Sequence, residues 1–465
     1  MKFSIFRLVY PLAALVGAAS CTYSPDETTT PRGVSSSQDA LAGLAWTSGT
    51  LASGQLIAPA NLRNLPGVND ATGGGGLVGT QFWKSNNPEA ITGEGWLMTN
   101  GGNAPQRGGT ATPLTGPVAL YFSHLNFMGQ LNNQNQPTTN RALYIHLLVS
   151  NPSSTAITVT GKGKAVVNNL WRFRQTNPSV KSAWYLVSEA WTNNTLDQVN
   201  LTVQPFKTAE IVKVLLPAQP SGQDNYVTEG RYELNVSGGS AYFTAVSTFD
   251  GSLTRAVTFG TGTTGQQAPG NQGSPLITVD NSGTAYGREA GIASHSAYYT
   301  GDVNVNLPST TGYMGLCFNT NNRKPIAEGS TVYYQDQSAP HTMRLQSSTR
   351  TWAGYGHKYN AKLILRNPTA TQKNVRISVG ANPINATNNV LFDSPFQTLV
   401  NGAAAQLHQV ILFNNQYSAN SRGPQRQNLR TVAVPGNGTV TVNVICFVPG
   451  LGFGAGLQLD LESGI

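Results

Sequence analysis

Charged residues and cysteine are both scarce in this chain. Of its 465 residues only 11% are charged and three are cysteine, while glycine and proline number 50 and 26. Few charges with 39% hydrophobic residues argue against a disordered chain, and abundant Gly and Pro favour a turn-rich β protein over a helical one. The length fits two domains, each large enough to bury a core.

Short catalytic and metal-binding motifs are also missing. The sequence has no H-E-x-x-H, C-x-x-C, G-x-S-x-G or S-x-x-K, and its six histidines are not at metal-ligand spacing. We therefore predict no metal, no cofactor and no catalytic residue. His146 lies in an alternating apolar run, where a hydrogen-bonded strand residue is the ordinary interpretation.

The N-terminus predicts export. Lys2 and Arg7 precede the apolar run 8–19, which is too short to span a bilayer and is typical of a signal peptide covering 1–20. The run ends in Ala18-Ala19-Ser20-Cys21, where small residues before a cysteine predict bacterial lipidation of Cys21. The alternative is cleavage near Ala19 and a freely secreted or periplasmic protein. In both cases the protein leaves the cytoplasm, so nucleic acid is not expected as a partner.

The rest of the chain predicts two tandem Ig-like β-sandwiches. Residues 21–53 are predicted to form a Ser/Thr/Pro-rich tether before a first domain at 54–257. A Gly/Gln/Thr-rich linker is expected at 258–275, followed by a second domain at 276–465. One short helix is predicted in the first domain, starting at Asn177-Pro178 and burying one apolar face that includes Trp184 and Trp191.

Two similar stretches support this architecture. Residues 143–159 (LYIHLLVSNPSSTAITV) and 362–379 (KLILRNPTATQKNVRISV) both join two strand-like runs through Asn-Pro and a polar turn. Proline has no N–H for a sheet and favours extended geometry in the residue before it, so each Asn-Pro marks a strand end. We interpret each stretch as a hairpin or sheet-crossing unit.

The sequence also resembles a known family. Its successive motifs PANLRNLPG (59–67), FWKSNNPEAITGEGWLMT (82–99), SHLNFMGQL (123–131) and residues 143–159 are similar to landmarks of the domain-of-unknown-function family numbered thirty-three seventy, found chiefly in cyanobacteria. Residues 359–379 and 432–461 extend the resemblance. It implies an exported, β-rich protein and assigns no catalytic residue.

Three groups of residues are candidates for function or cross-linking. Cys317 and Cys446 lie in apolar runs and are expected to form a disulfide or to remain two buried free thiols. A basic-aromatic cluster could bind an anionic polymer, or could be an ordinary solvated face; its members are Lys162, Lys164, Trp171, Arg172, Arg174 and Lys181. Glu89, Glu94 and Asp250 could pair as glycosidase carboxylates.

These patterns predict a lipid-anchored cell-envelope protein that acts by binding, with an anionic envelope polymer or another envelope protein as its partner. The alternative function is a surface glycan hydrolase that uses loop carboxylates.

Overall fold

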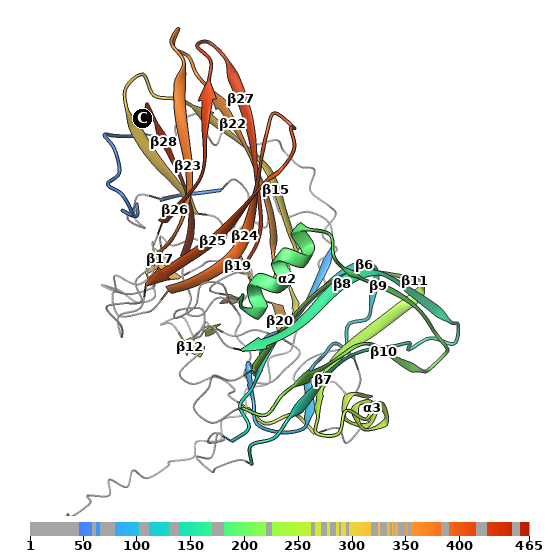
Figure 1. Cartoon of the computed structure of the whole chain (residues 1–465). Helices are drawn as coiled ribbons and strands as arrows, with labels where there is room; N and C mark the ends of the chain where they lie inside the picture. The colour runs from blue at the N-terminus through green and yellow to red at the C-terminus, as the bar shows by residue number, and fades with distance from the viewer. Residues whose placement is uncertain are drawn as a thin grey trace, which may run out of the picture. The chain divides into compact units, whose positions relative to one another are not determined.

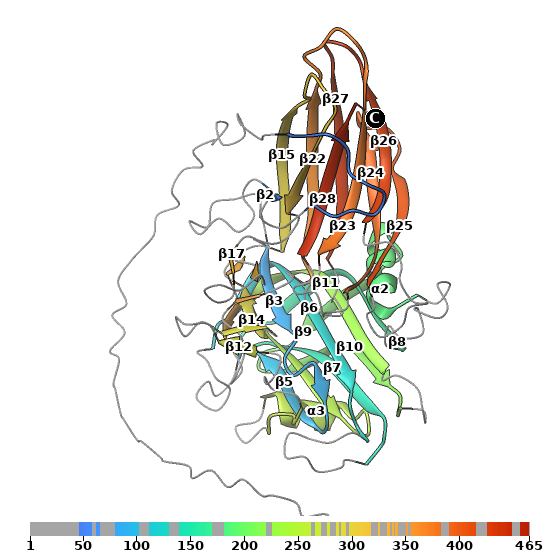
Figure 2. The same cartoon turned by 90° about the vertical axis from the view of Figure 1, so that its left-hand side faces the viewer.

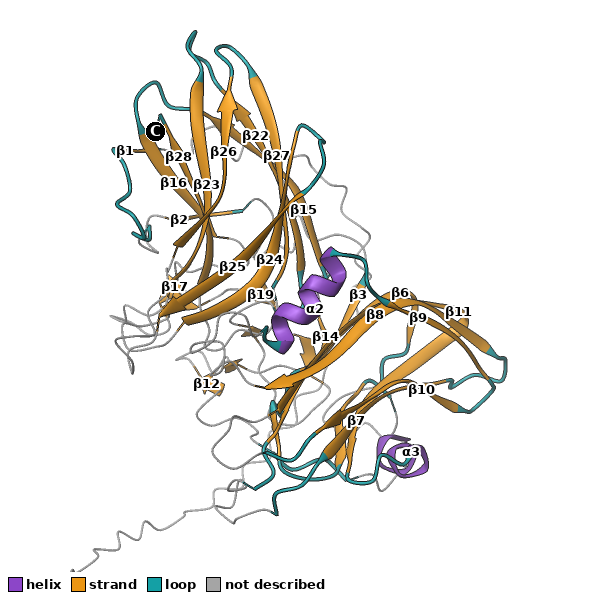
Figure 3. Ribbon diagram, in the orientation of Figure 1, coloured by secondary structure: helices purple, strands orange, loops and turns teal. Residues whose placement is uncertain are grey.

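The structure is a computed structural model that describes much of the chain from residue 46 onward. The described residues are 46–57, 62–65, 80–101, 111–129, 139–169, 181–219, 226–261, 266–270, 277–279, 285–287, 290–293, 297–317, 324–325, 333–334, 337–338, 340–342, 350–351, 355–382, 390–414, 426–448 and 456–464. Almost all regular elements among them are strands, with two helices, so the all-β prediction is confirmed (Figure 3).

An 11-stranded sheet, here called the N-terminal sheet, contains most strands before residue 250. Its strands are β3 (Gln81–Ser85), β4 (Ala90–Ile91), β5 (Gly95–Thr99), β6 (Leu114–Asn126), β7 (Leu143–Ser150), β8 (Ile157–Asn169), β9 (Asp197–Val203), β10 (Thr208–Leu216), β11 (Tyr226–Thr248), β14 (Ala290–Ala293) and β20 (Pro340–Thr342).

The long strand β11 bends this sheet around a core. Its first part pairs with β6 and β8, and its last part pairs with β5 and β7. The bend falls at Gly238 and Gly239, whose φ values of 80° and 159° fall where side chains are rarely tolerated. One cluster of buried apolar residues therefore draws on strands from both parts of the sheet.

Two further sheets, here called the C-terminal sheet pair, enclose a second core (Figure 1). The six-stranded sheet contains β1 (Thr47–Ser48), β2 (Leu62–Asn64), β16 (Gly312–Cys317), β23 (Lys373–Asn382), β26 (Arg426–Val434) and β28 (Gly456–Ser463). The five-stranded sheet contains β15 (Tyr298–Asn306), β22 (Lys358–Arg366), β24 (Val390–Val400), β25 (Gln406–Asn414) and β27 (Thr439–Phe447).

Short strands form two minor sheets. They are β12 (Ile277–Val279), β13 (Ala285–Gly287), β19 (Gln337–Ser338) and β21 (Arg350–Thr351) in one sheet, and β17 (Lys324–Pro325) and β18 (Tyr333–Tyr334) in the other.

Both Asn-Pro stretches are corners with the same hydrogen bonds; the first joins the two parts of the bent N-terminal sheet, and the second crosses between the sheets of the C-terminal sheet pair. Asn151 joins β7 to β8, and its Nδ2 donates to the carbonyls of Thr155 and Val203 at 2.7 and 2.9 Å. Asn367 joins β22 to β23, and its Nδ2 donates to Thr371 and Val434 at 2.8 and 3.1 Å. In each corner, the hydroxyl two residues after the asparagine donates to its Oδ1.

The repeat extends beyond the stretches that the sequence revealed. The backbone N–H of Asn151 donates to Lys207 in the β9–β10 turn, and that of Asn367 donates to Gly438 in the β26–β27 turn, both at 2.9 Å. Strand β8 pairs with β11 as β23 pairs with β28. Strand β6 likewise pairs with β11 as β16 pairs with β28. The two parts of the fold therefore repeat one topology, which the corner asparagines hold to a neighbouring hairpin.

The predicted helix is present but begins at Ala183, later than the predicted start at Asn177-Pro178, and the structure adds a second helix. Helix α2 (Ala183–Thr192) begins after Ser182, whose Oγ accepts a hydrogen bond from the Tyr185 N–H, and it buries Trp184 and Trp191 as expected. Asn177-Pro178 lies outside the described residues. Helix α3 (Leu253–Thr261) was not predicted, and its first residues dock on the N-terminal sheet through an ion pair between Arg255 and Glu94.

Strand pairing does not follow the predicted domain boundaries. Residues 258–261 of the predicted linker belong to α3, and the Ala268 N–H donates to the Trp96 carbonyl of β5 at 2.9 Å. Strands β14 and β20, from the predicted second domain, extend the N-terminal sheet beside β3. Backbone pairing overrides the composition of this segment, because a sheet edge gains hydrogen bonds wherever a strand can reach it.

The first described residues, 46–57 and 62–65, are here called the N-terminal segment, and they belong to the C-terminal sheet pair (Figure 2). β1 pairs antiparallel with β16, and β2 pairs parallel with the same strand. Leu51, Ile57 and Leu62 are buried in a small cluster. Residues 46–53 are therefore not part of a tether as predicted, because they pack on the C-terminal sheet pair; residues 21–45 lie outside the described residues.

Cys446 is a buried free thiol, so the disulfide alternative is not the one found. Burial raises the pKa of this thiol well above its ordinary value. The Cys317 side chain lies outside the described part of the structure.

Candidate functional site

Helix α2 lies between the two sheet systems. It packs on β8 and β11 of the N-terminal sheet and on β24 of the C-terminal pair (Figure 1). The Ser182 hydroxyl at its N-terminus also donates to Asp393 Oδ2 of β24 at 2.9 Å. The last helical carbonyl, of Thr192, accepts a bond from Gln397 Nε2. Both ends of the helix are thus hydrogen bonded to the same strand.

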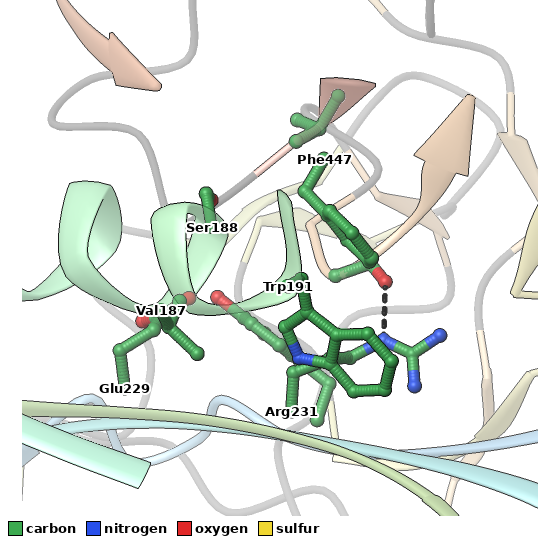
Figure 4. Close-up of a pocket in the computed structure, with 9 residues that line it drawn as sticks. Val187, Ser188, Trp191, Glu229, Arg231 and Phe447 are labelled. Carbon is green, nitrogen blue, oxygen red and sulfur yellow. Dashed lines mark hydrogen bonds between the residues drawn. The ribbon is translucent and has the colours of Figure 1, made fainter. Parts of the chain in front are cut away.

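Arg231 of β11 is buried beneath this helix, with a side chain that is 2% exposed. Its Nε donates to the Gly356 carbonyl at 3.0 Å (dashed line in Figure 4). Its Nη1 donates to the Tyr232 carbonyl at 2.7 Å. Four aromatic rings lie within 6 Å of its guanidinium, those of Phe82, Trp191, Tyr298 and Phe447. Cation–π contacts and carbonyl acceptors compensate part of the cost of burying this charge.

A small cavity adjoins Arg231 on the side of α2. Tyr121, Ser188, Trp191 and Glu229 are among the residues that line it, and its free volume is about that of one water molecule. Within the described structure, Ser188 Oγ and Trp191 Nε1 have no hydrogen-bond partner. Burial, and then the nearby Glu229 carboxylate, raise the pKa of Tyr121 well above its usual value. The cavity is too small for an organic ligand.

A cluster of four charged side chains and one tyrosine lies next to Arg231. We call it the α2 mouth and define it by Lys162, Arg231, Glu233, Tyr298 and Lys358. Arg231 Nη2 contacts Glu233 Oε1 at 3.4 Å, and Lys162 Nζ donates to Asn194 Oδ1, just beyond the end of α2, at 3.0 Å. Lys358 Nζ lies 5.4 Å from the centre of the Phe447 ring. Three cations therefore gather around the single carboxylate of Glu233.

The pKa of the half-buried Lys358 is lowered by burial and by the neighbouring cations. Burial lowers the pKa of Lys358; the Glu233 carboxylate raises it, whereas Arg231 and Lys162 lower it further. A bound anion would favour the charged form of this lysine. The α2 mouth is accordingly the described site best suited to accept a negative group.

The predicted basic-aromatic cluster is only partly brought together. Lys162 lies in the α2 mouth, but Lys164 pairs with Asp197 at 3.1 Å and Lys181 pairs with Glu189. Trp171, Arg172 and Arg174 lie outside the described residues.

Sequence reasoning missed Arg231 and Lys358. Arg231 occurs in the run of consecutive buried residues 227–232 in β11, and Lys358 is 127 positions further along the chain. No local pattern could have joined them. The one local signal was Glu229-Gly230-Arg231, where two charged residues flank a glycine within a strand-like stretch.

The carboxylates of the rival hydrolase hypothesis have structural contacts. Glu94 makes a two-point ion pair with Arg255 and accepts a bond from the Phe249 N–H, and Asp250 Oδ1 accepts from the Ser252 N–H at 2.9 Å. Glu94 therefore anchors α3. Both ring nitrogens of the buried His146 are hydrogen bonded, to Glu210 at 2.6 Å and to Thr248 at 2.8 Å, as expected for a structural histidine.

A second buried charged cluster lies on the six-stranded sheet. Arg426 is 4% exposed and donates to Asp460 Oδ2 at 3.0 Å and to Glu462 Oε2 at 2.6 Å. The Leu51 N–H of the N-terminal segment donates to the other oxygen of Glu462. Burial raises the pKa of Asp460 to about 7, although Arg426 opposes the shift. These contacts make the cluster an attachment point for the N-terminal segment.

Among the described residues, no group of three His, Cys, Asp or Glu side chains could hold a metal ion. Neither described helix is long and apolar enough to cross a membrane.

Comparisons with known proteins place the chain in no family. No protein-family model matches it, and neither does any curated protein, so the resemblance to family thirty-three seventy stays a prediction.

Solved structures give only distant similarities. The mosquito-larvicidal Cry4Aa toxin of Bacillus thuringiensis aligns over 76% of this chain and 58% of its own, with 9% identity and a TM-score of 0.16. The tandem CBM22 domains of Paenibacillus barcinonensis Xyn10C align over 80% and 90%, with 10% identity and a TM-score of 0.14. Scores this low support no conclusion about fold or function.

Proposed function

We propose that this protein is exported to the cell envelope, is anchored there by a lipid on Cys21, and binds an anionic envelope polymer at the α2 mouth. The observation that carries the binding proposal is the excess of positive charge there. Lys162, Arg231 and Lys358 surround one carboxylate, and a positive excess remains even when Glu229 on the cavity side is included. The net charge of +8 favours the same class of partner.

The site is also arranged to hold its charges in place. Arg231 is fixed by backbone carbonyls, and Lys162 is held by Asn194. Prepositioned cations lose less side-chain entropy when an anion binds. Lys358 lies in a partly buried position, where a charge contact is screened less by water and salt than at an open surface.

The Lys162→Gln, Lys358→Gln double variant should bind an anionic polymer about 5–30-fold more weakly, since each contact is expected to contribute about 0.5–1 kcal/mol. Wild-type affinity should fall with added salt, because such charges are screened over about 8–10 Å at ordinary ionic strength. Retention of the protein on immobilised acidic polymer, measured across a salt series, tests both expectations.

The matched control is Lys207→Gln, which removes the same charge from an exposed turn of the β9–β10 hairpin. Its retention should equal that of the wild type. If the double variant also binds as the wild type does at low salt, the α2 mouth is not the binding site.

Replacement of Cys21 by serine should release the protein from membranes, because an acyl chain provides affinity that a polar segment lacks. Fractionation of cells expressing each form measures this, and the mass of the mature N-terminus reports the lipid directly. An unmodified N-terminus on the wild-type protein would contradict the anchor.

A further inference from the structure

The outer face of the five-stranded sheet carries a row of cations that begins at the α2 mouth. Along β22, alternate residues point away from the core, and these are Lys358, Asn360, Lys362, Ile364 and Arg366. Lys358, Lys362 and Arg366 are spaced four residues apart, or about 13 Å at the rise of a strand. The row therefore extends about 26 Å from the α2 mouth.

Neighbouring strands flank this row with polar side chains in register. Asp302 and Asn306 of β15 lie opposite Lys362 and Arg366, and Asn443 and Thr441 of β27 lie opposite Lys362 and Ile364. The side chains of Asp302 and Lys362 are 54% and 41% exposed, so this surface is accessible.

Contacts between the strands hold these groups in position. Lys362 Nζ pairs with Asp302 at 3.2 Å, and Arg366 Nη2 donates to Asn304 Oδ1 at 3.1 Å. On the other side of β22, Asn443 Nδ2 donates to Asn360 Oδ1 at 2.9 Å. Each amide keeps further hydrogen-bonding capacity, because an Asn side chain has two N–H donors and two acceptor lone pairs.

We propose that β15, β22 and β27 form a track for an acidic polysaccharide, which runs from the α2 mouth along Lys358, Lys362 and Arg366. This inference rests on the proposed function and specifies its ligand class. Cations pair with the acid groups of such a chain, and amides that both donate and accept match sugar hydroxyls. The half-buried Ile364 and Ile445 provide apolar contact for the C–H faces of sugar rings.

Other anionic polymers fit the track less well. Single-stranded nucleic acid stacks its bases on aromatic rings. On the described outer face of these three strands, aromatic side chains occur only in the row of Lys358, as Tyr298 and Phe447. Polyphosphate offers neither hydroxyl groups for the amides nor apolar faces for the isoleucines.

Binding of purified full-length protein to polygalacturonate tests the track, with dextran as the uncharged and polyphosphate as the non-sugar comparison. The Lys362→Gln, Arg366→Gln variant should bind polygalacturonate about tenfold more weakly. The Asn360→Ala, Asn443→Ala variant should weaken polygalacturonate binding and leave polyphosphate binding unchanged. Lys207→Gln is the charge control, and unchanged thermal melting shows that each variant is folded.

The outcomes separate the track from the proposed function. If the Lys162, Lys358 variant loses binding while the Lys362, Arg366 variant keeps it, the track is wrong and the α2 mouth stands. If neither variant changes binding, the proposed function fails as well. Equal affinity for polyphosphate and polygalacturonate, with no effect of the asparagine substitutions, would overturn the assignment to polysaccharide.

Discussion

The Arg426→Met variant is expected to lose about 3–5 kcal/mol of unfolding free energy, the usual cost of removing one partner of a buried ion pair. Arg426 is the shared donor to Asp460 and Glu462, whose side chains are 0% and 1% exposed. Methionine would fill a similar volume but leave Asp460 without its cation and Glu462 with only its 3.3 Å contact to Arg376. Urea denaturation followed by circular dichroism measures the loss.

The control is Asp460→Asn, which removes one carboxylate and leaves Arg426 paired with Glu462. Because the pKa of Asp460 is raised to about 7, folding takes up a proton at this group between its unfolded value and pH 7. The contribution of Asp460 to the unfolding free energy is therefore fully present below about pH 4 and is lost as the pH rises through 7. Asp460→Asn should be much milder than Arg426→Met and should reduce that pH dependence. Equal losses in the two variants would contradict this account.

Loss of either corner asparagine should also be strongly destabilising. In Asn367→Ala, the carbonyls of Thr371, Val434 and Pro435 lose their side-chain donor, at about 1–3 kcal/mol for each group left buried and unsatisfied. Asn151→Ala should have a similar effect, because its contacts are the same in kind. Chemical denaturation of both variants measures the two losses.

Two further substitutions separate the contributions at this corner. Asn367→Asp keeps an acceptor for Thr369 but removes the Nδ2 donor, so it should resemble Asn367→Ala. Thr369→Ala removes one hydroxyl and should cost about 0.5–1.5 kcal/mol. If Asn367→Asp is as stable as the wild type, the corner does not depend on the amide donor.

The corners also show how far sequence reasoning could reach. Asn-Pro and the polar turn after it are local signals, so both corners could be predicted. The acceptors at Val203 and Val434 lie 52 and 67 residues away, and no spacing in the sequence indicates them. The hairpins β9–β10 and β26–β27, to which the corner asparagines are hydrogen bonded, have little sequence similarity to each other. Their correspondence was therefore missed.

Helix α3 was missed for a related reason. Its sequence LTRAVTFGT contains three threonines and a glycine, which have low helix propensity. The helix is stabilised from outside its own sequence, by Arg255 pairing with Glu94 and by Ala256 packing against Trp96 and Leu148. Tertiary contacts override propensity when they lie beyond the reach of a local window.

The sequence alone determined the β class, the two corners and helix α2, because alternation, proline and apolar periodicity act over a few residues. It also provided Lys162 as one member of the candidate site. Only the tertiary structure decided that β1 and β2 join the C-terminal sheet pair, and that β11 and β22 bring Arg231 and Lys358 beside Lys162. Backbone hydrogen bonds and charge contacts of this kind act between residues that are close in space, whatever their separation along the chain.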